Sequence, residues 1–510
     1  MLNERQINML PERIAGRINQ INNEYLESIG NVLKKIGELR PSDVHKLQQM
    51  YDYGADMHRI TLKLAEVSEK NTQEIYDIFD IVAKENYEYA KPFYEAKNIE
   101  FIPYEKNNRL KRYVKSLAKQ TVNEYANLTQ HTAFAIFDTD GKSIAPLFAR
   151  NRDKVATSLS DTYTKVVDYA VSKVQLGEES YQKAVKDICK AMVNSGIKTV
   201  DYATGYSRRL ESAVRQNVLW GVKQCNQNTA DQIGEEFGAD GYEISYHSNP
   251  RPEHADMGGK QYAIGPARVV KGVYYPSFEE EAEPLLDDFG CLHFKFSILL
   301  GVSRPAYSEE ELKAFKEDDA KSFEFEGKKY TKYEARQLQG KLESQIIRYK
   351  ELANMAKSAG NEDLRRETQA QINLLSSKYY KLSQASGLPT RAERMQVSGF
   401  SKVLTHTELW SSQIKGIISS NEIQVSSVAH HVYDQAKLRE LLPFMTKENM
   451  EKTLTNPLKI GKIKLDDKGR KSQQFIGDVI TLAVNPDTGV ITTTWKTSSK
   501  KVAKLKKGTP

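Results

Sequence analysis

The spacing of apolar residues over the first 240 positions restricts this part of the chain to helices. Apolar residues recur at intervals of three and four, as in Ile75, Ile78 and Val82, and few prolines interrupt the runs. A short stretch from 134 to 141 breaks the pattern and predicts a strand and a turn. Helical spacing resumes at 155 and ends at the turn sequence 238–241. We therefore expect a helical body over residues 1–240.

The pattern changes after this turn. Tyr242, Ile244 and Tyr246 alternate with polar residues, which predicts a half-buried strand. Prolines and glycines then follow in close succession, as is typical of loops. Residues 308–322 are acidic and then lysine-bearing, which indicates an exposed helix or a connector. Residues 241–322 are thus predicted to form a loop-rich module with a connector.

A helical arm is predicted over residues 323–395. It begins with the pattern of a small hairpin, after which Thr331 and Glu334 have the spacing of a capping box, so a helix should start there. Two apolar faces flank a turn at 358–361, which predicts an antiparallel pair of helices. Such a pair either projects as a stalk or docking arm or packs on the main body, and both interpretations stay open.

A linker over 396–427 with a short helix near 404–418 precedes a compact C-terminal part. The predicted elements there are helices over 428–442 and 445–454 and strands over 459–465, 475–484 and 490–496. Helices followed by a meander indicate a small α+β domain over 428–510. The expected fold is therefore multidomain and mainly α, with a helical body, a loop-rich His/Cys module, a helical hairpin and a C-terminal α+β domain with an antiparallel sheet.

Composition limits the remaining classes. At 510 residues the chain is too long for one domain, and its three distant cysteines cannot form a disulfide framework, so a reducing compartment is expected. The first residues lack an apolar signal region, and the longest nearly apolar stretch, 294–302, is far too short to span a membrane. We therefore expect no membrane anchor.

The net charge is unevenly placed. It is +7 overall, yet residues 456–510 hold 12 Lys and Arg against 4 Asp and Glu, so the other 455 residues sum to −1. Such asymmetry predicts that the C-terminal end meets a polyanion. A lysine tail that only aids solubility explains part of the excess, because residues 498–510 carry five lysines.

Four potential metal ligands lie within 47 residues of the loop-rich module. They are His247, His254, Cys291 and His293. Imidazole nitrogen and thiolate sulfur are zinc ligands, and four of them close a structural site. A module with few aliphatic residues needs another source of stability, which favours a structural zinc. The spacing matches no common zinc finger, and histidines that are only hydrogen-bonded are the alternative.

The same module carries a resemblance to a known family. The sequences that carry it are Glu243–His247, Arg251–Asp256, Gly259–Lys260, Tyr274–Phe278 and Phe289–His293, with Arg215–Val222 upstream and Gly301–Pro305 downstream. Over roughly residues 1–395 the chain resembles the phage minor capsid protein 2 family of tailed-phage head-morphogenesis proteins. Met257 departs from the family pattern, in which a tryptophan is expected for packing. The resemblance implies a minor virion component near the portal, with portal and capsid proteins as partners.

A second group of candidate residues lies in the basic C-terminal domain. A metal-free ribonuclease needs a base for the 2′-hydroxyl, an acid for the leaving oxygen and cations for the developing charge, and it needs no cofactor. The catalytic candidates are His430, His431, Arg439, Thr494 and Lys496, and the substrate-binding candidates are Arg470, Lys471 and Trp495. His431 is favoured because Arg439 follows two helical turns later on the same face. Each residue also has an ordinary structural explanation, since a His pair caps helices and a Thr-rich strand is common.

From about residue 427 to 507 the chain resembles the Barnase–EndoU–colicin–RelE-like nuclease fold. Gln435 stands where that fold usually places an arginine, four residues after the histidine. The resemblance implies an RNA-cleaving effector domain on a capsid protein, found in the virion and, during assembly or after delivery, in the host cytoplasm. Two alternatives remain: a purely structural virion protein whose basic tail binds packaged DNA, and a free cytoplasmic ribonuclease toxin.

Overall fold

The computed structural model describes residues 4–38, 53–130, 132–135, 156–176, 181–200, 207–288, 291, 293–466 and 469–507. The chain forms two compact units, the first made of residues 1–361 and 372–400 and the second of residues 362–371 and 401–510. Helices dominate the first unit, and the second combines helices with a sheet. The predicted mainly α, multidomain fold class is confirmed.

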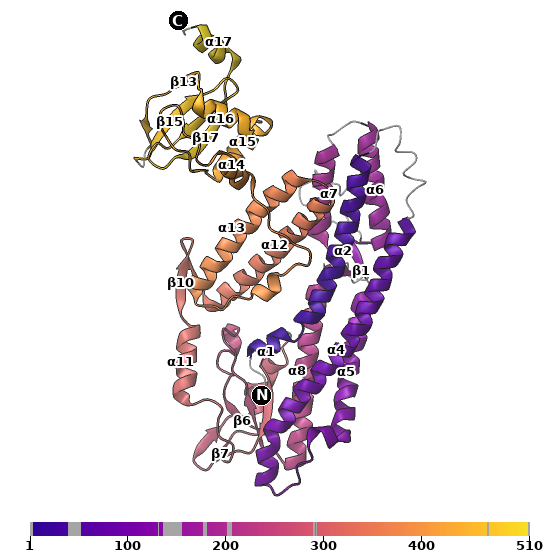
Figure 1. Cartoon of the computed structure of the whole chain (residues 1–510). Helices are drawn as coiled ribbons and strands as arrows, with labels where there is room; N and C mark the ends of the chain where they lie inside the picture. The colour runs from indigo at the N-terminus through magenta and orange to yellow at the C-terminus, as the bar shows by residue number, and fades with distance from the viewer. Residues whose placement is uncertain are drawn as a thin grey trace. The chain divides into compact units, whose positions relative to one another are not determined.

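Long helices build the body of the first unit (Figure 1). α8 (Leu210–Phe237) packs against α2 (Glu12–Gly37), α4 (Tyr53–Ala96) and α5 (Asn108–Gln130). The apolar stripes that predicted these helices are the faces they bury, as at Ile29, Phe79, Val114 and Val218. The shorter helices of the body are α1 (Glu4–Met9), α6 (Leu159–Leu176) and α7 (Tyr181–Ser195).

Short strands interrupt the helical body. They form one sheet in the order β2-β1-β3-β4, with bounds β1 (Thr132–Ala135), β2 (Ala156–Thr157), β3 (Lys198–Val200) and β4 (Ser207–Arg209). The prediction of helix throughout 155–237 was therefore wrong at β3 and β4, where Gly196 ends α7 at a φ of 62°. The strand near 134 is confirmed, and the predicted turn at 138–141 lies outside the described residues.

The helical arm packs on the body. α12 (Lys332–Ser358), which starts at the predicted capping box of Thr331 and Glu334, lies against α2 and α7. Asn22 Nδ2 donates to the buried carboxylate of Glu351 at 2.9 Å, and Arg209 pairs with the same carboxylate at 2.6 Å. Of the two interpretations of the arm, packing on the body is therefore the one observed. The preceding hairpin is β10 (Ser322–Phe325) and β11 (Lys328–Thr331), and the second helix is α13 (Glu362–Ser386).

The module that follows α8 is a small antiparallel sheet with long connections. Its strands are β5 (Gly241–Ile244), β6 (Gln261–Ala263) and β9 (Lys295–Ile298) in the order β6-β5-β9, beside a hairpin of β7 (Arg268–Val270) and β8 (Val273–Tyr275). Two one-turn helices, α9 (Phe278–Glu281) and α10 (Glu283–Leu286), cover its core, where Ile244, Phe278 and Leu286 meet. The exposed helix predicted over 308–322 is α11 (Glu309–Asp319).

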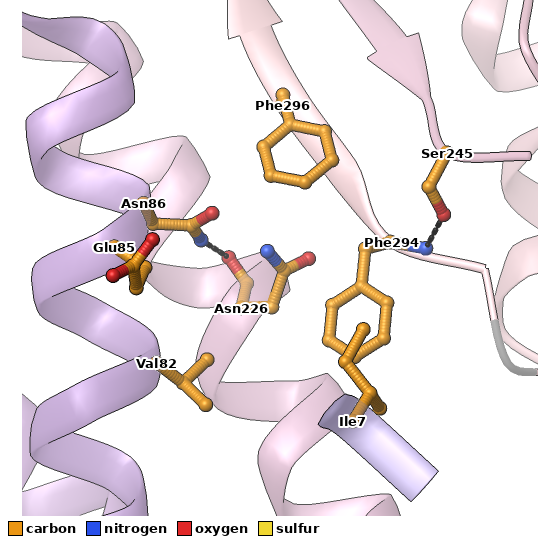
Figure 2. Close-up of a pocket in the computed structure, with 8 residues that line it drawn as sticks. All are labelled: Ile7, Val82, Glu85, Asn86, Asn226, Ser245, Phe294 and Phe296. Carbon is orange, nitrogen blue, oxygen red and sulfur yellow. Dashed lines mark hydrogen bonds between the residues drawn. The ribbon is translucent and has the colours of Figure 1, made fainter. Parts of the chain in front are cut away.

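The module meets the body at a small cavity of about 40 Å³ (Figure 2). Phe294 and Phe296 face α4 and α8 there, and Asn86 Nδ2 donates to the carbonyl oxygen of Asn226 at 3.4 Å. The Phe294 amide donates to Ser245 Oγ at 2.9 Å. A space of this size holds only about three water molecules, so it is a packing gap and not a substrate site.

The second unit is built on a six-stranded sheet in the order β12-β17-β16-β15-β13, with β14 also pairing with β15. The strands are β12 (Ser427–Val428), β13 (Lys459–Ile460), β14 (Lys464–Leu465), β15 (Lys471–Ile476), β16 (Ile480–Val484) and β17 (Val490–Lys496); the helices are α14 (His406–Ile414), α15 (His431–Leu438), α16 (Lys447–Thr455) and α17 (Ser499–Lys507). Trp410, Val432, Leu454 and Leu482 belong to one hydrophobic core in this unit.

Three details of this unit differ from the prediction. The sheet is mixed, because β12 runs parallel to β17 while the other pairs are antiparallel. The single strand predicted over 475–484 is a hairpin, which turns at Gly477 where the amide donates to Ile480 O. α14, which was assigned to the linker, packs against β12 and α16 within this unit.

Within the described ranges, no helix has the length and apolar character needed to cross a bilayer.

Candidate functional site

Three potential metal ligands meet inside the small sheet module. The ligand atoms of His254, Cys291 and His293 all lie within 4.8 Å of one another, and all three side chains are buried. His254 ends a short 3-10 helix (Pro252–His254), whereas Cys291 and His293 lead into β9. Cys291 Sγ is 3.5 Å from His293 Nδ1. In a tetrahedral zinc site the same atoms stand about 3.6 Å apart, as the metal–ligand bond lengths require.

The protonation of this group suits a metal. Burial lowers the pKa of His293 to about 2, and neighbouring His247 and His254 add to the effect. Burial likewise lowers the pKa of His254. Both imidazoles are therefore neutral, which is the form that offers a nitrogen lone pair to a metal.

One nitrogen of each of these two imidazoles also lacks a hydrogen-bond partner. The buried Nε2 atoms of His254 and His293 have no hydrogen bond among the described residues. A buried polar atom without a partner is costly, so it indicates a missing ligand. Gly258 borders the site, and a Cβ there would stand 3.0 Å from His293 Nε2. The donor set thus fits a metal ion, with Nδ1 of His293 turned toward Cys291 and Nε2 of His254 without a hydrogen bond among the described residues.

His247, the fourth predicted ligand, lies beside this group but is not part of it. Its ring centroid is 4.3 Å from that of His293, and its Nδ1 is 3.1 Å from the Ser248 carbonyl oxygen.

Two further neighbours of the His254, Cys291 and His293 group were not predicted from the sequence. Asp288 Oδ2 is 3.7 Å from His254 Nε2, and buried Lys223 donates to the Leu286 carbonyl oxygen. Asp288 precedes Cys291 by only three residues, and this short spacing could have marked it as a neighbour of the candidate ligands.

Part of the second predicted site comes together along β17. His431 Nε2 is 2.7 Å from the Thr492 carbonyl oxygen, and because a carbonyl only accepts, Nε2 carries the proton. Arg439 donates to the Thr494 carbonyl oxygen, and its guanidinium lies 5.4 Å from the ring centroid of Trp495. His431 and Arg439 are both exposed and Trp495 is half-buried, so one edge of the sheet presents an imidazole, a guanidinium and part of an indole to solvent.

The other predicted members lie elsewhere. Thr494 is fully buried, and its hydroxyl contacts Met445 Sδ at 3.5 Å, so it offers solvent no group. Lys496 lies over the Phe444 ring at 5.2 Å. His430 is exposed, with Nδ1 3.4 Å from Thr407 Oγ1. Gln435, which stands where the nuclease fold has an arginine, accepts a hydrogen bond from the Thr493 hydroxyl.

Arg470 and Lys471 lie at the opposite end of the sheet from Lys496. Lys496 pairs with Ile480 at the start of β16, whereas Lys471 begins β15, whose first residues lie beside the end of β16. Arg470 pairs with Asp466 at 2.7 Å and Lys471 with Asp487 at 2.9 Å. The strand register therefore separates these two cations from Lys496, and β16 lies between β15 and the strand β17 that His431 contacts.

Comparisons with known proteins agree with one of the two resemblances. A family model described as Phage minor capsid protein 2 matches residues 2–382. No curated protein and no solved structure gives a significant match. None of these comparisons supports the resemblance of the C-terminal part to a nuclease fold. Since the match covers most of the 510 residues, the chain belongs to the phage minor capsid protein 2 family and is a capsid component of the virion.

Proposed function

We propose that this capsid component lies beside the portal of the phage head and that its C-terminal unit contacts nucleic acid there. The observation that carries the second part is α17, a helix with five lysines and no acidic residue. These lysines are exposed, and within the described residues none forms an ion pair; they are Lys500, Lys501, Lys504, Lys506 and Lys507. An unneutralised row of cations attracts phosphates, which fits a protein that shares the head with packaged DNA.

Binding of the full-length protein to duplex DNA over a series of salt concentrations tests this function. Replacing the five α17 lysines with glutamine should weaken binding and lower the slope of log K against log salt by about 0.9 for each phosphate that is no longer neutralised. Replacing the same five with arginine keeps the charge and should keep the slope. Equal slopes for the glutamine variant and the unmodified protein would exclude α17 as the DNA-binding element.

The location beside the portal rests on the family, whose members act in head morphogenesis. Neighbours of the portal occupy one vertex of the head, so labelled protein should appear at a single vertex in electron micrographs of purified heads. Label spread evenly over the shell would place the protein among the major capsid subunits instead.

Cleavage of RNA is the second candidate function of the C-terminal unit. The observation that favours it is the exposed edge formed by His431, Arg439 and Trp495, which offers a proton-transfer group, a cation and a stacking surface. Because Nε2 of His431 donates to the backbone, Nδ1 is the atom that would accept a proton from the 2′-hydroxyl.

Zinc in the small sheet module would act as a structural ion. His254, Cys291 and His293 supply three buried ligands, and His247, whose ring lies against His293, is our choice for the fourth. The ion would tie the 3-10 helix at His254 to the segment that enters β9, so that the loops between them stay ordered.

A further inference from the structure

A cationic groove of about 580 Å³ lies on the first unit and shares no residue with either candidate site. It is lined by one face of α12 and by the short 3-10 helix η4 (Ala392–Met395) with the residue before it. Five cations line this cationic groove: Arg336, Lys341, Arg348, Arg391 and Arg394. The remaining lining side chains are glutamine, serine and glycine, so the groove has no apolar wall.

The carboxylates of the described residues do not balance these cations. Glu343 pairs with Arg391 at 2.9 Å. Glu12 is shared, because it pairs with Arg394 at 3.0 Å and with Arg215 at 2.9 Å. Within the described part of the chain no carboxylate forms an ion pair with Lys341 or Arg348. The groove therefore holds an excess of positive charge that an anionic ligand would neutralise.

The crowding of like charges supports this conclusion. Burial lowers the pKa of Arg348 and the nearby guanidinium of Arg209 lowers it further, while Glu351 and Glu211 act in the opposite direction. The pKa of Arg394 is also lowered, first by burial and then by Arg391. A bound anion interacts more strongly with partly desolvated guanidinium groups than with fully hydrated ones.

We propose that the cationic groove binds the phosphodiester backbone of duplex DNA. Four of its five cations are arginines, whose planar guanidinium matches phosphate oxygens bidentately. Phosphate contacts are made by Arg, Lys, Ser and Gln side chains, which are the residues present. Binding segments of proteins instead insert apolar anchors into apolar pockets, and this groove offers none.

The length of the groove fits a short stretch of backbone. Arg336 and Arg348 stand twelve residues apart on α12, or about 18 Å at 1.5 Å per residue. At 3.4 Å per base pair this spans about five base pairs of duplex. The groove shares no residue with α17, so separate variants can test the two sites.

Gly340 allows a test that spares the fold. It lies on the lining face of α12, and a Cβ there would have no atom within 4 Å. Gly340→Glu places a carboxylate among the cations, and Gly340→Ala is the uncharged control; both residues favour helix over glycine. The full-length protein that carries the five α17 glutamines serves as the background, so that DNA binding reports on the groove alone.

In this background, the Gly340→Ala protein should still bind a 30-base-pair duplex with a salt-dependent affinity. Gly340→Glu should weaken binding about tenfold near 0.1 M salt and lower the salt slope by about one to two. Arg348→Gln should lower the slope by about one. If Gly340→Glu and Gly340→Ala bind DNA equally, or if the background does not bind DNA at all, the proposal is overturned. Loss of particle incorporation by Gly340→Glu with unchanged DNA affinity would instead assign the groove to an acidic protein partner.

Discussion

Cys291 Sγ lies 3.5 Å from Nδ1 of His293, beside the small apolar core of the sheet module. The two residues are separated by a single position in the sequence. His254 precedes β6 whereas Cys291 follows α10, so the fold brings the two ends of this segment together. A thiol and two neutral imidazoles in this arrangement have the chemistry of three zinc ligands.

The protein is therefore expected to hold one zinc ion per chain, measured by elemental analysis after dialysis. Cys291→Ser should lose the ion, because a serine hydroxyl is a much weaker ligand than a thiolate. Chelation should lower the melting temperature of the unmodified protein and leave that of Cys291→Ser unchanged.

Cys225→Ser is the matched control, since Cys225 is also a buried free cysteine but lies on α8. It should keep the ion. Zinc content that is the same in both variants, or absent from the unmodified protein, would contradict the site.

Two glycines of α2 should respond to alanine with opposite signs. Gly16 has open space where a Cβ would stand, whereas a Cβ on Gly30 would lie 2.8 Å from the Met355 carbonyl oxygen of α12. Gly16→Ala should raise the free energy of unfolding by about 0.5–1 kcal/mol through helix propensity. Gly30→Ala should lower it by about 1–3 kcal/mol, because backbone must shift. Denaturant unfolding of both variants measures the difference, and equal effects would contradict the close packing of α2 on α12.

Removal of Arg209 should be strongly destabilising. Its guanidinium pairs with Glu211 and Glu351 at 2.6 Å each, and both carboxylates are buried. Arg209→Met leaves two buried carboxylates without their cation, which costs about 3–5 kcal/mol. The double variant Arg209→Met/Glu351→Gln removes one of these charges and should recover part of the stability. Thermal unfolding compares them; a single variant as stable as the unmodified protein would contradict the network.

The ribonuclease candidate makes a separate prediction. If the His431 edge cleaves RNA, activity should survive EDTA, leave 2′,3′-cyclic phosphate ends and spare DNA, which lacks the 2′-hydroxyl. His431→Ala should then slow cleavage by about 10²–10⁴-fold, while Thr494→Val should matter only through packing, since Thr494 is buried. His430→Ala is the neighbouring control. Equal turnover by the unmodified protein and the His430/His431 double alanine variant would remove this active site.

Local signals were enough to predict much of the fold. The capping box at Thr331 and Glu334 starts α12 where expected, because its hydrogen bonds join residues three apart. His254, Cys291 and His293, three of the four predicted ligands, could be placed together for a similar reason, since they fall within one short module. The parallel pairing of Ser427 with Val490 could not be predicted, because nothing near either residue encodes the register of a distant strand.

The cationic groove could not be predicted from the sequence either, because it joins residues that are distant in the chain. Arg336 and Arg348 share a helix face, but Arg391 and Arg394 reach them only through the return of the chain after α13. The composition gave no indication of the groove, because the net charge of the residues before 456 is close to zero. Thr494 was selected as a catalytic candidate, but its hydroxyl is buried. A Thr-rich strand does not show which hydroxyl points inward, because a bulge shifts the register of β17.

The hydrogen bond between Asn22 and Glu351 joins residues 329 positions apart. At synthesis rates of roughly 5–20 residues per second, α2 leaves the ribosome roughly 15–65 s before its partner on α12 exists. During that time the face of α2 that ends up against α12 has nothing to cover it. The protein therefore cannot complete its body until α12 (Lys332–Ser358) has also left the ribosome, so the order of synthesis delays the folding of its N-terminal helices.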